Sequence, residues 1–147
     1  SDFARAEKDF YSMRGLSVMM GGFVGILMII TGPYIANLFN PTPESKKILV
    51  EVLNVTGIFC AIYCYNSVSF FVLRSGGDTT RAFILDQTPT YVIGIPLAII
   101  FGLNAKAWGL SLGVIFLITH SNDVFKIFLG NYFVNKKKWL TNITTEI

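Results

Sequence analysis

The stretch GLSVMMGGFVGILMIITGPYIANLFNPTP, from Gly15 to Pro43, contains no charged side chain. A helix needs about 20 predominantly apolar residues to cross the hydrocarbon core of a bilayer, so this stretch alone is long enough. Three further stretches also lack charge, over 52–73, 87–105 and 107–122. The last of these is short and needs its flanking residues to reach the required length. The pattern therefore predicts a membrane protein with four transmembrane helices.

The expected fold is all-α and polytopic, with boundaries set by charged residues, glycines and prolines. We expect transmembrane helices over 16–39, 48–72, 82–103 and 107–133. A short amphipathic linker helix over 1–15 is expected before them, and a basic tail over 134–147 after them. The connections are predicted at 40–47, 73–81 and 104–106.

Prolines and small residues predict local features of these helices. Pro33, Pro89 and Pro96 should bend the helices that contain them, because proline removes a backbone hydrogen-bond donor. Small residues spaced four apart allow two helices to approach closely in lipid. The sequence offers two such pairs, Gly21 with Gly25 and Gly109 with Gly113.

Composition excludes a soluble globular protein. Of the 147 residues 52% are hydrophobic and only 14% are charged, and mean hydropathy is +0.56. Soluble domains carry roughly 25% charged residues, which they need to cover their surface. The net charge of +3 is too small to indicate a nucleic-acid partner. Cys60 and Cys64 lie four apart within an apolar stretch, and we interpret them as small packing residues.

The sequence gives little support to an enzymatic function. Its single histidine, His120, has no other metal-ligating residue at ligand spacing. We interpret it as a polar packing residue, with a proton-relay group as the alternative. There is no nucleophile motif, phosphate-binding loop or dinucleotide fingerprint. We therefore expect no enzymatic activity and no cofactor.

Lysine and arginine predict the orientation in the membrane. Four spans place both ends of the segment on one side. That side would carry nine of the 12 basic residues, and the opposite side would carry Lys46, Lys47 and Lys106. Because basic residues concentrate in cytoplasmic loops, we expect both ends to be cytoplasmic, in a plasma-membrane protein.

Polar side chains within the predicted spans indicate a cavity. Asn66, Tyr63 and Tyr65 lie in the span over 48–72, and Asp86 lies near the start of the next. Polar groups at this depth usually face other helices or water, and neighbouring aromatic rings attract organic cations. We take these four as substrate or cavity candidates. The alternatives are ordinary aromatic packing for the tyrosines and a helix cap for Asp86.

A further charged pair lies in the last predicted span. Asp123 and Lys126 are three residues apart, so their side chains share one helix face. We expect the two charges to neutralise each other.

One block of sequence resembles a known family. The run from Leu73 to Thr79, LRSGGDT, looks like the signature that follows the tenth helix of multidrug and toxic compound extrusion transporters. Three weaker matches accompany it: Leu38-Phe39-Asn40 with Pro43-Glu44 following, Asp86 with Tyr91 and Gly94-Ile95-Pro96-Leu97-Ala98, and Lys138-Trp139. The resemblance implies helices nine to twelve, part of the C-terminal lobe of a twelve-helix, two-lobed transporter. The chain also begins without methionine, and we expect it to continue a longer protein.

This resemblance implies cation-coupled efflux. Family members export cationic drugs and metabolites in exchange for Na⁺ or H⁺ by alternating access. The implied partners are lipid, the remaining N-terminal helices and an organic-cation cargo. Some branches carry an acidic residue within the tenth helix, whereas this chain has none over 52–73 and places Asn66 there.

The signature block is expected to form a cytoplasmic chain reversal. Its members are Leu73, Arg74, Gly76, Gly77, Asp78 and Thr79. We expect Asp78 to cap the following helix or to pair with Arg74 or Arg81. Direct contact with cargo is the alternative role.

Two other functions compete with drug efflux. One is a flippase for lipid-linked saccharides, which would favour a wide basic cavity, whereas the predicted spans have almost no internal lysine or arginine. The other is a small four-helix scaffold that binds partners through its glycine faces.

Overall fold

The computed structural model describes residues 2–140, and every regular element among them is a helix. In chain order these are α1 (Phe3–Leu38), α2 (Pro43–Ser75), α3 (Thr79–Pro89), η1 (Thr90–Gly94), α4 (Ile95–Leu103), α5 (Ala105–Trp108), α6 (Leu112–His120) and α7 (Asn122–Asn135).

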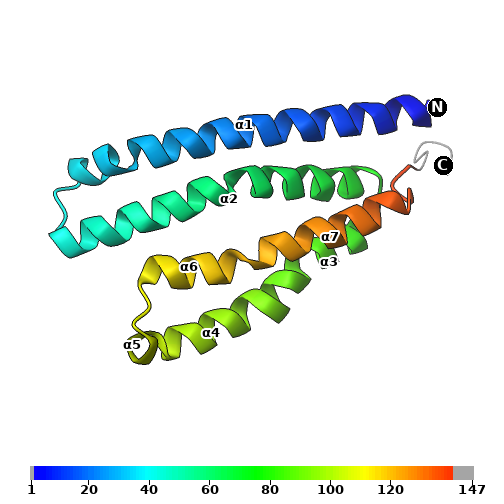
Figure 1. Ribbon diagram of the computed structural model, residues 1–147. Coiled ribbons are helices and arrows are strands. Elements are labelled where there is room, and N and C mark those ends of the chain that lie inside the picture. Colours follow the sequence, from blue (N-terminus) through cyan, green and yellow to red (C-terminus); the bar gives the residue numbers. More distant parts are fainter. Residues whose placement is uncertain (1, 141–147) are drawn as a thin grey trace.

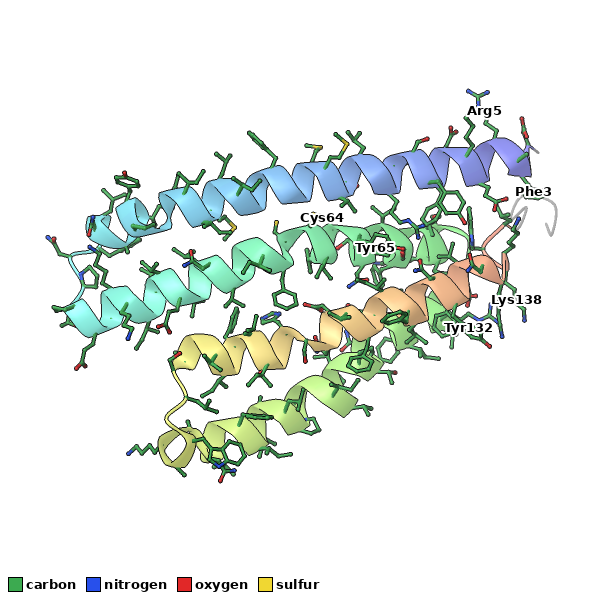
Figure 2. All side chains as sticks on the ribbon, in the orientation of Figure 1. Phe3, Arg5, Cys64, Tyr65, Tyr132 and Lys138 are labelled. Atoms are coloured by element: carbon green, nitrogen blue, oxygen red, sulfur yellow. The ribbon has the colours of Figure 1, made fainter. Side chains whose placement is uncertain are left out.

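Four helical stretches are long and apolar enough to cross a membrane: α1, α2, the run Thr79–Leu103 and the run Leu112–Asn135. The prediction of an all-α protein with four membrane-length helices is therefore confirmed. Each stretch runs antiparallel to the one before it in the chain (Figure 1). Phe3 and Lys138 therefore lie at the same end of the bundle, here called the terminal end (Figure 2). Residue 1 and residues 141–147 of the predicted tail lie outside the described part.

The first helix is longer than predicted. The linker helix over 1–15 and the span over 16–39 form one continuous helix of 36 residues, α1. Asp2 caps it by accepting a hydrogen bond from the backbone N–H of Arg5 at 3.1 Å. A single glycine at 15 costs an exposed helix only about 1 kcal/mol, which does not end it. Pro33 does not end α1 either, because the helical backbone continues to Leu38.

Small residues bring α1 and α2 together, as the Gly21–Gly25 pair predicted. A Cβ atom added at Gly21 would lie 2.7 Å from Sγ of Cys64. One added at Gly25 would overlap the backbone oxygen of Gly57. Cys64 therefore packs between the two helices, and both cysteines are free thiols (Figure 2).

The turn between α2 and α3 is shorter than the predicted loop over 73–81. Leu73 and Arg74 still belong to α2, and Thr79 already begins α3. Only Gly77 has the positive φ, +82°, that the reversal requires. Gly76 is small for a different reason, because a Cβ there would overlap the backbone of Trp139.

The third span changes its helical pitch between its two prolines. Over Thr90–Gly94 the backbone forms a π-helix, in which the N–H of Ile95 donates to the oxygen of Thr90. Pro96 has no N–H to donate to residue 92, and a widened turn accommodates such a gap. The expected disturbance near Pro89 and Pro96 is thus a π segment within a continuous span.

The connection before the fourth span is longer than the predicted 104–106. It contains α5 and then Gly109, whose φ of +63° closes that short helix. The span begins at Leu112 rather than at 107, so Gly109 and Gly113 do not share a helix face. The predicted second small-residue pair was therefore wrong. Gly113 instead packs against Glu51 of α2.

The main buried core lies at the terminal end. It is formed by Phe10, Leu73, Ala82, Leu85, Val134 and Trp139. Trp139 follows α7, and its indole Nε1 donates to the backbone oxygen of Val134 at 3.1 Å. Its ring packs on Phe10 at 5.5 Å. This core ties the start of α1 to the ends of α2 and α7 and holds α3 against them.

Candidate functional site

A cavity of about 190 Å³ lies where α2, α3 and α7 meet. Its lining combines aromatic rings, two carboxylates, an ammonium and an amide: Tyr63, Asn66, Ser67, Phe70, Phe71, Leu85, Asp86, Asp123 and Lys126. Three of the four predicted cavity residues, Tyr63, Asn66 and Asp86, are therefore neighbours in space.

Lys126 lies between the two carboxylates of the cavity. Its Nζ is 3.6 Å from Oδ1 of Asp86 on α3 and 3.8 Å from Oδ1 of Asp123 on its own helix. The side chains of Lys126 and Asp123 are only 14% and 11% exposed, whereas that of Asp86 is 47% exposed. The predicted Asp123–Lys126 pairing is confirmed. The two carboxylates and one ammonium leave the lining with a net charge of −1.

Asn66 also lines the cavity and is itself buried, at 8% exposure. Its Nδ2 donates to the backbone oxygen of Asp123 at 2.9 Å, which joins α2 to α7. Its Oδ1 is buried and has no hydrogen-bond partner among residues 2–140. A buried acceptor without a partner costs roughly 1–3 kcal/mol.

His120 extends the polar cluster along the fourth span. Its Nδ1 lies 3.3 Å from Oδ2 of Asp123. Its ring packs against Phe116 at 4.2 Å and against Phe59 of α2 at 5.9 Å. These contacts agree with the predicted packing role. Within the described part of the chain, the histidine, cysteine and acidic side chains form no group able to hold a metal ion.

Comparison with known proteins decides the family. The MatE family profile matches residues 1–100, which is more than half of the chain. The chain belongs to the MatE family. A protein of Saccharomyces cerevisiae described as an uncharacterized transporter is 31% identical over 118 residues. That match covers 78% of this chain and 16% of the yeast protein, so the chain spans a small part of that relative. No solved structure matches the chain.

Membership of the MatE family explains the four apolar helices, since MatE proteins are membrane transporters. The signature block that pointed to MatE lies beside the cavity rather than in it. Arg74 and Thr79 line a neighbouring groove of about 320 Å³, which also reaches Asp86. Asp86 therefore borders both the cavity and the groove.

Asp78 of the MatE signature has the predicted capping role. Its Oδ1 accepts from the N–H of Arg81 at 3.3 Å, and its Oδ2 accepts from the Arg81 guanidinium at 2.9 Å. Of the two arginines considered, Arg81 is the partner, because it lies one helical turn after the cap. The pair is largely buried and fixes the start of α3, the helix that carries Asp86.

Tyr65, the fourth predicted cavity residue, does not line the cavity. It lies between α2 and α7, where its hydroxyl donates to Oδ1 of Asn131 at 2.5 Å (Figure 2). The guanidinium of Arg14 lies 4.5 Å from its ring centre and donates to the same Asn131 oxygen at 3.0 Å. Arg14 also stacks on Phe10, at 5.0 Å. Tyr65 thus belongs to a clamp that joins α1, α2 and α7.

Asp123 and Lys126 were not predicted as site residues. A signal was present for both, because charges inside an apolar span are costly unless they pair or serve a function. Their three-residue spacing predicted the pair, but only the packing of α3 on α7 shows that Asp86 joins it.

Proposed function

We propose that this chain forms part of the C-terminal lobe of a secondary active efflux antiporter that exports organic cations. The observation that carries this proposal is the cavity in which the half-exposed carboxylate of Asp86 faces aromatic side chains. The protein would exchange cargo for Na⁺ or H⁺ by alternating access in the plasma membrane, with the terminal end in the cytoplasm.

The chemistry of the cavity supports a cationic cargo. Its lining carries a net charge of −1, and the aromatic residues Tyr63, Phe70 and Phe71 line it together with Asp86. A cation is attracted both by the carboxylate and by the quadrupoles of the rings. An apolar body on that cation would gain from contact with the same rings. An organic cation meets all of these groups at once.

The size of the cavity supports a larger assembly. Drug-sized sites usually enclose roughly 300–1,000 Å³, and this cavity holds about 190 Å³. The yeast relative is far longer than this chain, which matches 16% of it. We propose that further helices of the same protein complete the site, and that the two lobes move against each other as in other carriers.

The competing functions fit the structure less well. A flippase must accommodate a lipid-linked saccharide with anionic phosphates, and a cavity with a net negative lining repels such a group. A scaffold would need its glycine face free for partners. Gly21 and Gly25 are instead buried against α2, within the chain itself.

Transport in vesicles tests the proposed function. Inside-out membrane vesicles from cells that express the natural gene would be incubated with external radiolabelled tetraethylammonium under an imposed Na⁺ or H⁺ gradient. We expect uptake that depends on one of the two gradients and is absent from vesicles of cells without the gene. Uptake that is independent of both gradients would rule out antiport. Uptake of an anionic lipid-linked saccharide in place of tetraethylammonium would favour the flippase.

A further inference from the structure

Lys126 presents an unusual feature for a cation site, because the site already contains a cation. Its ammonium lies between Asp86 and Asp123, at 3.6 and 3.8 Å, and is only 14% exposed. The two carboxylates differ in their surroundings. Asp123 is buried and also faces His120, whereas Asp86 opens to the cavity and the groove. Asp86 is therefore more accessible to a cargo cation than Asp123.

We propose that Lys126 is a built-in counter-cation that competes with cargo for Asp86 and restricts the cavity to organic cations of a single charge. This inference rests on the proposed function, since it concerns which cations the site accepts. With Lys126 present, the two carboxylates leave one negative charge uncompensated, which one monovalent cation neutralises. A dication would bring an excess positive charge close to the lysine.

Lys126 can keep a carboxylate partner when a cargo cation binds Asp86. Its contact with Asp86 joins α7 to α3, whereas its contact with Asp123 is three residues away on the same helix. Lys126 can release Asp86 and stay paired with Asp123, because both groups are carried by α7.

Two variants distinguish the effect of the net charge of the cavity lining from competition between Lys126 and cargo for Asp86. Lys126→Met removes the ammonium and leaves two uncompensated carboxylates in the lining. The double variant Asp123→Asn with Lys126→Met removes a buried charge pair together, which proteins tolerate far better than removal of one partner. It restores the net charge of −1 and frees Asp86 from its internal competitor.

The experiment measures binding of two probes to the purified product of the natural gene in lipid nanodiscs. The probes are tetraethylammonium, a monocation, and methyl viologen, a compact dication. The buffer is held at about pH 8, where histidine side chains are ordinarily neutral. Lys8→Met serves as the matched control, since Lys8 is exposed on α1 at the terminal end.

The expected results differ between the variants. Lys126→Met should raise the affinity for methyl viologen relative to tetraethylammonium by roughly tenfold or more, because one unit charge is added close to the ligand. The double variant should keep the preference for the monocation and bind it roughly threefold to tenfold more tightly than the wild type, because no internal cation competes. Lys8→Met should match the wild type.

The results distinguish a failure of this inference from a failure of the proposed function. If the double variant binds tetraethylammonium no more tightly than the wild type, competition by Lys126 is overturned while the proposed function stands. The double variant decides this even where Lys126→Met does not fold. If Lys126→Met folds and keeps the wild-type preference between the probes, the charge restriction is overturned. If the wild type binds neither probe, the proposed function fails and this inference fails with it.

Discussion

Nδ2 of Asn66 on α2 donates a hydrogen bond of 2.9 Å to the backbone oxygen of Asp123 on α7. This bond lies at the wall of the cavity and joins the second span to the fourth. It also holds the segment that carries Asp123 and Lys126 at a fixed height against α2. The amide thus positions the segment that carries the charged groups, and its buried Oδ1 has no hydrogen-bond partner among residues 2–140.

Removal of this amide should loosen the bundle. We expect Asn66→Ala to lower the free energy of unfolding by about 1–2 kcal/mol, the usual effect of losing a buried hydrogen bond. The change is measured as a fall in the Tm of the purified protein in detergent. Thr56→Val is the control, because the Thr56 hydroxyl donates to the backbone oxygen of Val52 on its own helix. Equal Tm values for the two variants would contradict the positioning role of Asn66.

The close approach of α1 and α2 should not tolerate a methyl group at Gly25. Its Cβ would overlap the backbone oxygen of Gly57, and backbone atoms cannot move aside as a flexible side chain can. We expect Gly25→Ala to destabilise the protein by about 1–3 kcal/mol, as overpacking does. Gly22→Ala is the matched control, since nothing lies within 4 Å of its added Cβ. Thermal unfolding of the two variants side by side checks this, and a Gly25→Ala protein as stable as Gly22→Ala would contradict it.

Asp78 should matter for folding more than for cargo. Asp78→Asn keeps a capping oxygen but weakens the largely buried ion pair with Arg81. The weakened cap and ion pair should lower the free energy of unfolding by about 1 kcal/mol. We therefore expect a lower yield of folded protein. The relative affinities for different cations should stay the same. Fluorescence-detected size-exclusion chromatography gives the yield, with Asp9→Asn as the exposed control. A normal yield with altered cation preference would assign Asp78 to cargo contact instead.

The two tyrosines of α2 should behave differently. Tyr65→Phe removes a hydroxyl that bonds Asn131, so we expect a loss of about 1 kcal/mol in stability and unchanged cation binding. Tyr63 lines the cavity and is largely exposed, so Tyr63→Ala should weaken tetraethylammonium binding at nearly unchanged Tm. Both variants are measured for Tm and for binding. The reverse outcome would place Tyr65 rather than Tyr63 at the cargo site.

Much of the fold followed from local features of the sequence. Charge-free stretches located the four spans, and Asp78 was predicted as the cap of the third, although that helix begins at Thr79 rather than at 82. Gly21 and Gly25 predicted the close approach of a neighbouring helix. Each of these depends on residues close in sequence or on a simple periodicity. The turn at Gly109 was missed because the residues that follow Lys106 are uncharged and mostly apolar, like the interior of a span.

The site could be predicted only in part, because it depends on how helices rotate against one another. Tyr63 and Tyr65 are two residues apart, so they point to nearly opposite sides of α2. The sequence did not reveal which side faces the cavity. Asp86 and Lys126 are 40 positions apart and meet only because α3 packs on α7. Such contacts come from tertiary packing, which a single sequence does not display.

The role of Asp86 in binding cations is the central claim, and equilibrium binding of tetraethylammonium to the purified natural gene product tests it most directly. Wild type, Asp86→Asn and the exposed control Asp9→Asn would be compared by scintillation proximity at matched protein amounts. We predict that Asp86→Asn weakens binding by roughly tenfold or more, as loss of a charge partner does, and that Asp9→Asn does not change it. Equal affinity of the wild type and a folded Asp86→Asn protein would contradict the account.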